Sequence, residues 1–186
     1  MTRRLRHLTR AELTEAQRAV HDAIVGGKRS REQAATSLVE DDGSLRGPFN
    51  AMLHAPDIGD RLQSVGAAIR YESSLQDRLR ELATLRVAHN RGSRFEIWIH
   101  SELAIAAGVT ADELELLAHG RLPATLTSSE EAAMQVVDTV LGSGRIGQEK
   151  YERWRDALDE QALVELTVLA GYYQLLDMLM RLFDVG

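Results

Sequence analysis

The chain has no cysteine among its 186 residues. This absence excludes disulfide bonds, thiolate metal ligands and every reaction that depends on a cysteine thiol. Proline is also scarce, with three residues in the whole chain. Since proline interrupts helices, its scarcity leaves room for long helical segments.

The chain also lacks a basic excess and a long apolar run. Its 22 Lys and Arg against 28 Asp and Glu give a formal net charge of −6, which argues against a nucleic-acid-binding protein. No stretch approaches the roughly 18 consecutive apolar residues of a membrane span. No apolar run follows the basic segment 1–10, so we expect no signal peptide. We therefore expect a cytoplasmic protein with neither nucleic acid nor membrane as a partner.

Leucine, alanine and valine recur at helical spacing, whereas strand-like alternation of useful length does not occur. The pattern predicts an all-α fold with a single all-helical domain over residues 1–186. We see no G-x-G-x-x-G or P-loop motif, which argues against nucleotide-binding folds. The polar segment 28–47 could form a covering loop, in part helical over 32–39. The expected helices are 13–24, a short one from 48 to about 56, 57–71, 75–89, 94–107, 110–119, 128–141, 148–158 and 160–183.

The segment 80–108 carries the residues best suited to chemistry. Glu96 and His100 are four apart, so a helix places them on one face. The helices 75–89 and 94–107 are joined by about four residues, which predicts an antiparallel hairpin. In such a hairpin Glu81 can approach His100. Two carboxylates and an imidazole in apolar surroundings can supply one proton donor and one acceptor near neutral pH.

This segment resembles the carboxymuconolactone decarboxylase family. The resemblance rests on the order Arg-Glu-Leu, a second Glu fifteen residues after the first, a His nineteen after it, and a helix that ends at glycine. It covers residues 45–120 well and the C-terminal part, about 127–185, loosely. It implies a helical bundle of the alkyl hydroperoxidase D-like type around the central hairpin, assembled as a homo-oligomer, trimer or hexamer. It also implies that Glu81, Glu96 and His100 are the catalytic residues.

The same resemblance separates two kinds of chemistry. In the alkyl hydroperoxidase D branch, two cysteines carry out thiol-based peroxide reduction, and the matching positions here are Ser93 and Glu96. Neither residue can form a thiolate, so the thiol peroxidase function is excluded by chemistry. The decarboxylase branch carries a Glu at the second position, as this chain does.

Structural roles are alternatives for the same residues. Ser93 and Glu96 fit the capping-box pattern S-x-x-E, as do Thr9–Glu12, Ser73–Gln76, Thr110–Glu113 and Thr127–Glu130. His100 could be a hydrogen-bonded core histidine, and Glu81 could pair with Arg78, Arg80 or Arg86. The three residues could also ligate a divalent metal ion, although no second histidine stands nearby in sequence. We expect no metal and no cofactor.

We therefore predict a cofactor-free acid–base enzyme: a decarboxylase, or a related lyase or isomerase. Its substrate would be a small carboxylated or lactone-like metabolite. Candidate substrate contacts are Ser93, Trp98, His54 and Arg86, and candidate cations for an anionic substrate are Arg46, Arg86, Arg91 and Arg94. The alternative is a non-catalytic oligomeric ligand-binding protein that uses the same pocket. Because helix 160–183 is apolar on most of its circumference, we expect it in the core or in a subunit interface.

Overall fold

The computed structural model describes residues 4–28 and 38–185. Every regular element in these residues is helical, and the one β interaction is an isolated bridge between Val39 and Leu45. The predicted all-α fold class is therefore confirmed. Most of the segment 32–39, where a helix was an alternative, lies outside the described residues. The chain forms two compact units, Met1–Glu72 with Leu175–Gly186 and Ser73–Gln174. Each is described separately, and the single-domain organisation stays a prediction.

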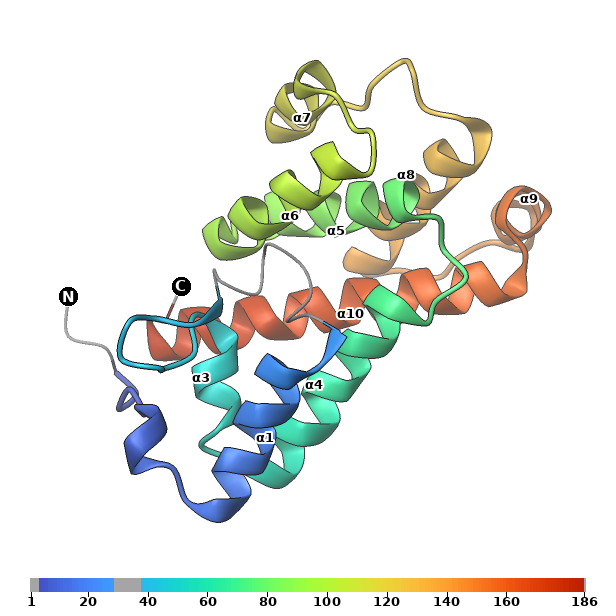
Figure 1. Ribbon diagram of the computed structural model, residues 1–186. Helices are drawn as coiled ribbons and strands as arrows, with labels where there is room; N and C mark the ends of the chain where they lie inside the picture. The colour runs from blue at the N-terminus through green and yellow to red at the C-terminus, as the bar shows by residue number, and fades with distance from the viewer. Residues whose placement is uncertain (1–3, 29–37, 186) are drawn as a thin grey trace. The chain divides into compact units, whose positions relative to one another are not determined.

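The first unit is built around helix α4 (Pro56–Tyr71). Helix α1 (Glu15–Gly26) and the short α3 (Pro48–Met52) both pack against it, as Figure 1 shows. The approach of α3 to α4 depends on Gly59, because an added Cβ there would lie 2.3 Å from the Met52 carbonyl oxygen. A 3₁₀ turn (Arg10–Glu12) precedes α1 and begins with the predicted capping box of Thr9 and Glu12.

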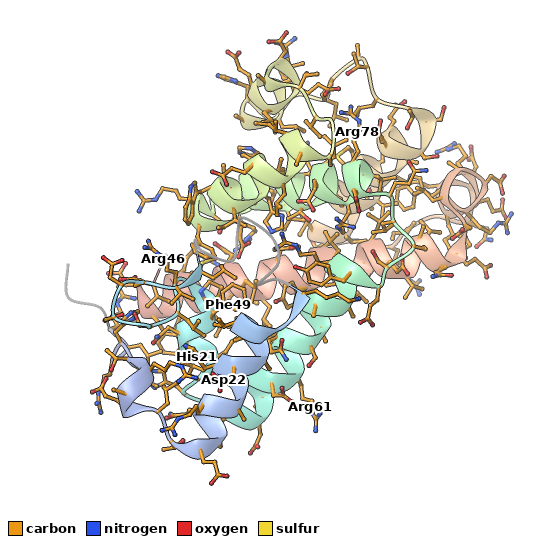
Figure 2. All side chains as sticks on the ribbon, viewed as in Figure 1. His21, Asp22, Arg46, Phe49, Arg61 and Arg78 are labelled. Atoms are coloured by element: carbon orange, nitrogen blue, oxygen red, sulfur yellow. The ribbon has the colours of Figure 1, made fainter. Side chains whose placement is uncertain are left out.

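Two histidines connect the N-terminal part of this unit to the turn at residues 42–44. His7 Nε2 lies 2.6 Å from Ser44 Oγ, and the buried His21 has its Nε2 3.1 Å from the Gly43 carbonyl oxygen. His21 also contacts its neighbour Asp22 through Nδ1, at 3.1 Å, and both are labelled on α1 in Figure 2. These contacts fix the turn against α1.

The second unit is organised by helix α5 (Asp77–Arg91), which packs against α6, α7 and α8. Its partners are α6 (Arg94–Ala106), α7 (Ala111–Ala118) and α8 (Ser128–Leu141), and α9 (Gln148–Leu158) packs on α8. Gly92 ends α5 in the left-handed conformation, with φ 68°, and Ser93 N–H donates to the Ala88 carbonyl at 2.9 Å. The chain thus reverses within two residues, and α5 and α6 form the predicted hairpin.

Arg78 at the start of α5 connects three helices of this unit (labelled in Figure 2). Its guanidinium lies 2.7 Å from Glu113 on α7 and 2.8 Å from Glu130 on α8. Each glutamate also closes the capping box of its own helix, as predicted. Hydrogen bonding from Arg78 lowers the pKa of Glu113 from 4.5 to about 2, against the opposing effect of burial.

The last helix, α10 (Glu160–Phe183), belongs to both units. By length and composition it is the one helix among the described residues that could cross a membrane, and 44% of its most apolar window is buried. Core helices of folded proteins pass the same test, so the expectation of no membrane partner stays a prediction. Within the second unit, Glu165 of α10 accepts hydrogen bonds from the backbone N–H and hydroxyl of Ser74.

Candidate functional site

The α5–α6 hairpin brings Glu81, Glu96 and His100 together. His100 Nδ1 lies 2.7 Å from Glu81 Oε2, and His100 Nε2 lies 3.5 Å from Glu96 Oε2. All three residues are buried, with exposed fractions of 2%, 4% and 4%. The spatial convergence expected from the spacing is therefore present, and the catalytic role of the three residues stays a prediction.

A carboxylate faces each ring nitrogen of His100. An ionised carboxylate only accepts hydrogen bonds, so the short contact with Glu81 places a proton on Nδ1. The contact between Nε2 and Glu96 is longer than an ordinary hydrogen bond. Nε2 and Glu96 can therefore hold one transferable proton between them, while Glu81 fixes the ring orientation. This is a suitable arrangement for general acid–base chemistry.

The capping-box interpretation of Glu96 is wrong. Ser93 is the N-cap residue of α6, but its side chain makes no capping hydrogen bond, and no capping box is present there. The Glu96 carboxylate is directed at His100 instead. The Ser93 hydroxyl is buried and has no hydrogen-bond partner among the described residues. The Ser73–Gln76 capping box is also absent, because α5 begins two residues later than expected and Gln76 is its N-cap.

Arg80 is the cation that contacts Glu81. Its Nε and Nη2 atoms each lie 3.3 Å from Glu81 Oε1, the oxygen that does not contact His100. Of the three arginines that could pair with Glu81, Arg78 binds Glu113 and Glu130 and Arg86 binds Asp138. The sequence alone left these three alternatives open.

Tyr173 on α10 is a site residue that the sequence did not indicate. Its ring contacts the His100 ring edge-to-face, with centroids 5.0 Å apart and an interplanar angle of 85°. Tyr172 continues the aromatic contact at 5.3 Å from Tyr173. Both tyrosines are buried, and both lie in the helix 160–183 that we expected in the core or in a subunit interface. The available signal was a pair of hydroxyl-bearing rings within an otherwise apolar helix.

Other predicted substrate contacts are placed elsewhere. Trp98 is 43% exposed and packs edge-to-face on Phe95. It follows Glu96 by two residues, and this spacing on a helix directs the two side chains to different faces. Arg86 forms a bidentate ion pair with Asp138 of α8, at 2.7 and 3.0 Å, and donates to the Gly120 carbonyl. The structure thus gives Arg86 a structural partner rather than a free guanidinium.

Two further candidates, His54 and Arg46, belong to the first unit, and a metal site was a further alternative. His54 Nε2 lies 2.8 Å from the Arg6 carbonyl oxygen, within the first unit. Arg46 belongs to the same unit, and its buried Nε has no hydrogen-bond partner among the described residues. No group of three or more His, Asp or Glu side chains in the described part of the chain is arranged to hold a metal ion.

Comparison with known proteins finds a family match over the central part of the chain. Residues 56–139 match the carboxymuconolactone decarboxylase family, and this range includes the whole hairpin with Glu81, Glu96 and His100. This segment is therefore similar to that family, as the sequence motif indicated, and the chain has no cysteine. A comparison with curated proteins finds no match.

Solved structures with the same fold include two kinds of protein. One is a protein of unknown function from Agrobacterium tumefaciens, a candidate AhpD antioxidant defence protein, with 17% identity and a TM-score of 0.64, covering 75% of this chain and 96% of that one. The other is the debrominase Bmp8. Its apo form has 13% identity and a TM-score of 0.69, covering 94% of this chain and 89% of that one. A cysteine-to-alanine variant of it in complex with 2,3,4-tribromopyrrole has 13% identity and a TM-score of 0.70, covering 100% of this chain and 92% of that one. These likenesses establish an AhpD-like all-α fold.

Proposed function

We propose that this protein is a cofactor-free acid–base enzyme, a decarboxylase or a related lyase or isomerase. The observation that carries the proposal is the buried imidazole of His100 with a carboxylate at each ring nitrogen, at 2.7 and 3.5 Å. The match of residues 56–139 to the carboxymuconolactone decarboxylase family supports the same class of reaction. The proposed substrate is a small carboxylated or lactone-like metabolite.

The proposed mechanism needs one proton delivered to one carbon. Loss of CO2 leaves a carbanion, and a conjugated carbonyl of the substrate spreads the charge as an enolate. His100 Nε2, with Glu96, then protonates the carbon, and Glu81 keeps the Nδ1 proton in place. An isomerase would use the same pair to remove and return a proton. The reaction needs no electron transfer.

Two buried hydroxyls on the hairpin support a polar ligand. Thr84 lies one turn after Glu81 on α5, and Ser93, the N-cap residue of α6, precedes Glu96 by three residues. Neither hydroxyl has a hydrogen-bond partner among the described residues. Since buried polar groups are normally satisfied, a substrate oxygen or an ordered water is a reasonable partner for each.

Thiol chemistry does not extend to this chain. Bmp8 is a debrominase, and its complex with tribromopyrrole was obtained with a variant in which alanine replaces a cysteine. This chain has serine and glutamate where related peroxidases carry cysteines, and it has no other cysteine. A non-catalytic ligand-binding protein that uses the same buried groups is the alternative function.

A direct assay decides between these functions. The wild-type protein is incubated in D2O with a panel of small unsaturated lactone acids, including carboxymuconolactone. Proton NMR then follows CO2 loss and deuterium incorporation. We expect turnover in the wild type and in His119→Gln, whose exposed ring bonds the Glu115 carbonyl. We expect none in His100→Gln. Binding of a panel compound without turnover would favour the ligand-binding alternative.

A further inference from the structure

Arg80 reaches Glu81 although the two residues are adjacent on α5. Neighbouring residues on a helix do not normally face each other, so the guanidinium folds back over the Glu81 carboxylate. Its Nη1 atom is anchored at 2.8 Å by Asp77. The Arg80 side chain is 12% exposed, whereas that of Asp77 is 77% exposed. The guanidinium therefore lies between an exposed aspartate and a buried glutamate.

The two oxygens of Glu81 have separate partners. Oε2 accepts the proton of His100 Nδ1, and Oε1 accepts from Arg80. Arg80 thus places a positive charge beside the Glu81 carboxylate and leaves the contact between Glu81 and His100 in place. Since arginine stays protonated at every accessible pH, this charge is constant while the charge of His100 changes.

We propose that Arg80 is a positioning residue that keeps Glu81 ionised during proton transfer. An ionised Glu81 retains the Nδ1 proton of His100, so that Nε2 is the nitrogen that exchanges its proton with Glu96 or the substrate. This inference rests on the proposed acid–base function. Without the guanidinium, the buried group of Glu81, Glu96 and His100 would carry one proton more than in the wild type, and it would keep that proton to a higher pH. Protonated Glu81 would no longer fix the ring.

Three acidic residues that α7 and α8 direct at α5 pair with other arginines in the described part of the chain. Helix α6 contributes Glu96 and His100 to the site, and α10 contributes the ring of Tyr173. The acidic groups that α7 and α8 direct at α5 bond to two other arginines: Glu113 and Glu130 to Arg78, and Asp138 to Arg86. Of these three arginines, Arg80 is therefore the one that contacts Glu81.

The experiment measures the His100 ring in the ligand-free protein. Nitrogen-15 NMR of histidine-labelled protein reports which ring nitrogen carries a proton at each pH, and the His100→Gln spectrum assigns the signal. In Arg80→Gln, we expect the titration of the His100 ring to move to higher pH than in the wild type, because a nearby positive charge is removed. We also expect loss of the fixed Nδ1 proton in the neutral ring. Arg121→Gln removes the same charge at an exposed position and should leave both unchanged.

A second variant keeps the test decisive. Arg80→Lys retains the charge but not the guanidinium fork, so we expect a shift in the same direction that is smaller than that of Arg80→Gln. It serves as the deciding variant if Arg80→Gln does not fold, as judged by circular dichroism. A titration and tautomer identical to wild type in a folded Arg80 variant would overturn the proposal. Because the ring is observed without substrate, a wild-type protein with no turnover would overturn the proposed function separately.

Discussion

Glu96 and His100 lie one turn apart on α6, with Glu96 Oε2 3.5 Å from His100 Nε2. The distance is slightly too long for a strong hydrogen bond, and both side chains are about 5% exposed. A proton on either group can therefore leave without breaking a short bond. Glu81 lies closer to the other nitrogen, at 2.7 Å. The carboxylates of Glu81 and Glu96 thus have different roles, and substituting each residue in turn tests the two roles separately.

Replacing Glu96 with glutamine should remove the carboxylate that exchanges the proton, while the side chain keeps nearly the same shape and packing. We expect any turnover to fall by about 10²- to 10⁴-fold, the usual contribution of a positioned acid or base. Initial rates measured with a substrate from the lactone acid panel, alongside thermal unfolding, check this. Glu102→Gln makes the same chemical change at an exposed position on α6 and should keep full activity. Equal rates in the two variants would remove Glu96 from the mechanism.

The protein should not reduce hydroperoxides through a thiol. It has no cysteine, so neither a sulfenic acid nor a disulfide can form on the chain. We expect consumption of an alkyl hydroperoxide with a dithiol reductant to equal the rate without protein. Protein treated with a chelator is the proper sample, since trace metals also destroy peroxides. Robust turnover in that sample would contradict the prediction.

Replacing Arg78 with methionine should destabilise the second unit. The variant leaves the carboxylates of Glu113 and Glu130, whose side chains are 6% and 8% exposed, without their cation. Arg78 is itself 25% exposed, so we expect the free energy of unfolding at pH 7 to fall by about 2–4 kcal/mol. Urea unfolding measures this. Arg153→Met, which breaks an exposed pair with Glu149 within α9, should have almost no effect.

The same network predicts how stability depends on acid. The folded-state pKa of Glu113 lies at about 2, below its ordinary value of 4.5. Its contribution to stability is therefore fully present above about pH 4.5 and is lost as the pH falls toward 2. In Arg78→Met this part of the acid dependence should shrink. If wild type and variant lose stability in parallel between about pH 5 and about pH 2, the Arg78–Glu113 pair contributes nothing to the acid dependence.

We predict a homo-oligomer, trimer-based, that uses the exposed face of α10. Five apolar side chains on this face are between 37% and 64% exposed: Val164, Val168, Leu175, Met178 and Leu182. Their spacing places them along one side of the helix. Stable interfaces bury about 1,200–2,000 Å² in total, which such a face can help to supply. Light scattering at micromolar concentration should give a mass of three or six times the 20.7 kDa of one chain.

Paired substitutions test which surface is used. Val168→Glu with Met178→Glu places charge on the apolar face and should dissociate the oligomer to the monomer mass. Changing Gln161 and Arg181, exposed polar residues on the same helix, to alanine should not. A wild-type mass of one chain would refute the oligomer, and an unchanged mass in the double variant would place the interface elsewhere.

The parts of the site that could be predicted from sequence are local. The i, i+4 spacing fixed Glu96 and His100 on one face, and a short turn ending at Gly92 brought the previous helix alongside. Equal distances from that turn then put Glu81 opposite His100. Each step depends only on helix geometry and a short connection. The S-x-x-E pattern at Ser93 was misleading, because a glutamate at that position can cap the helix or turn toward a neighbouring helix.

The parts that could not be predicted depend on distant contacts. Tyr173 lies on the last helix, and nothing in its local sequence indicates that its ring would contact His100. Arg86 and Asp138 are 52 residues apart, and their ion pair follows from how α8 packs on α5. Arg78, Arg80 and Arg86 are equivalent as sequence candidates for Glu81. The positions of the acidic residues on α7 and α8 decide between them.

Helix α5 buries eight of its fifteen residues and joins its neighbours through Arg78 and Arg86. In native-state amide exchange, such a segment opens only when most of the surrounding structure opens with it. The backbone of α5 should therefore be among the slowest in the protein to take up deuterium. Glu81 lies just over one turn inside this helix, so local fluctuations that open loops or the terminal residues of helices will leave the orientation of the His100 ring intact.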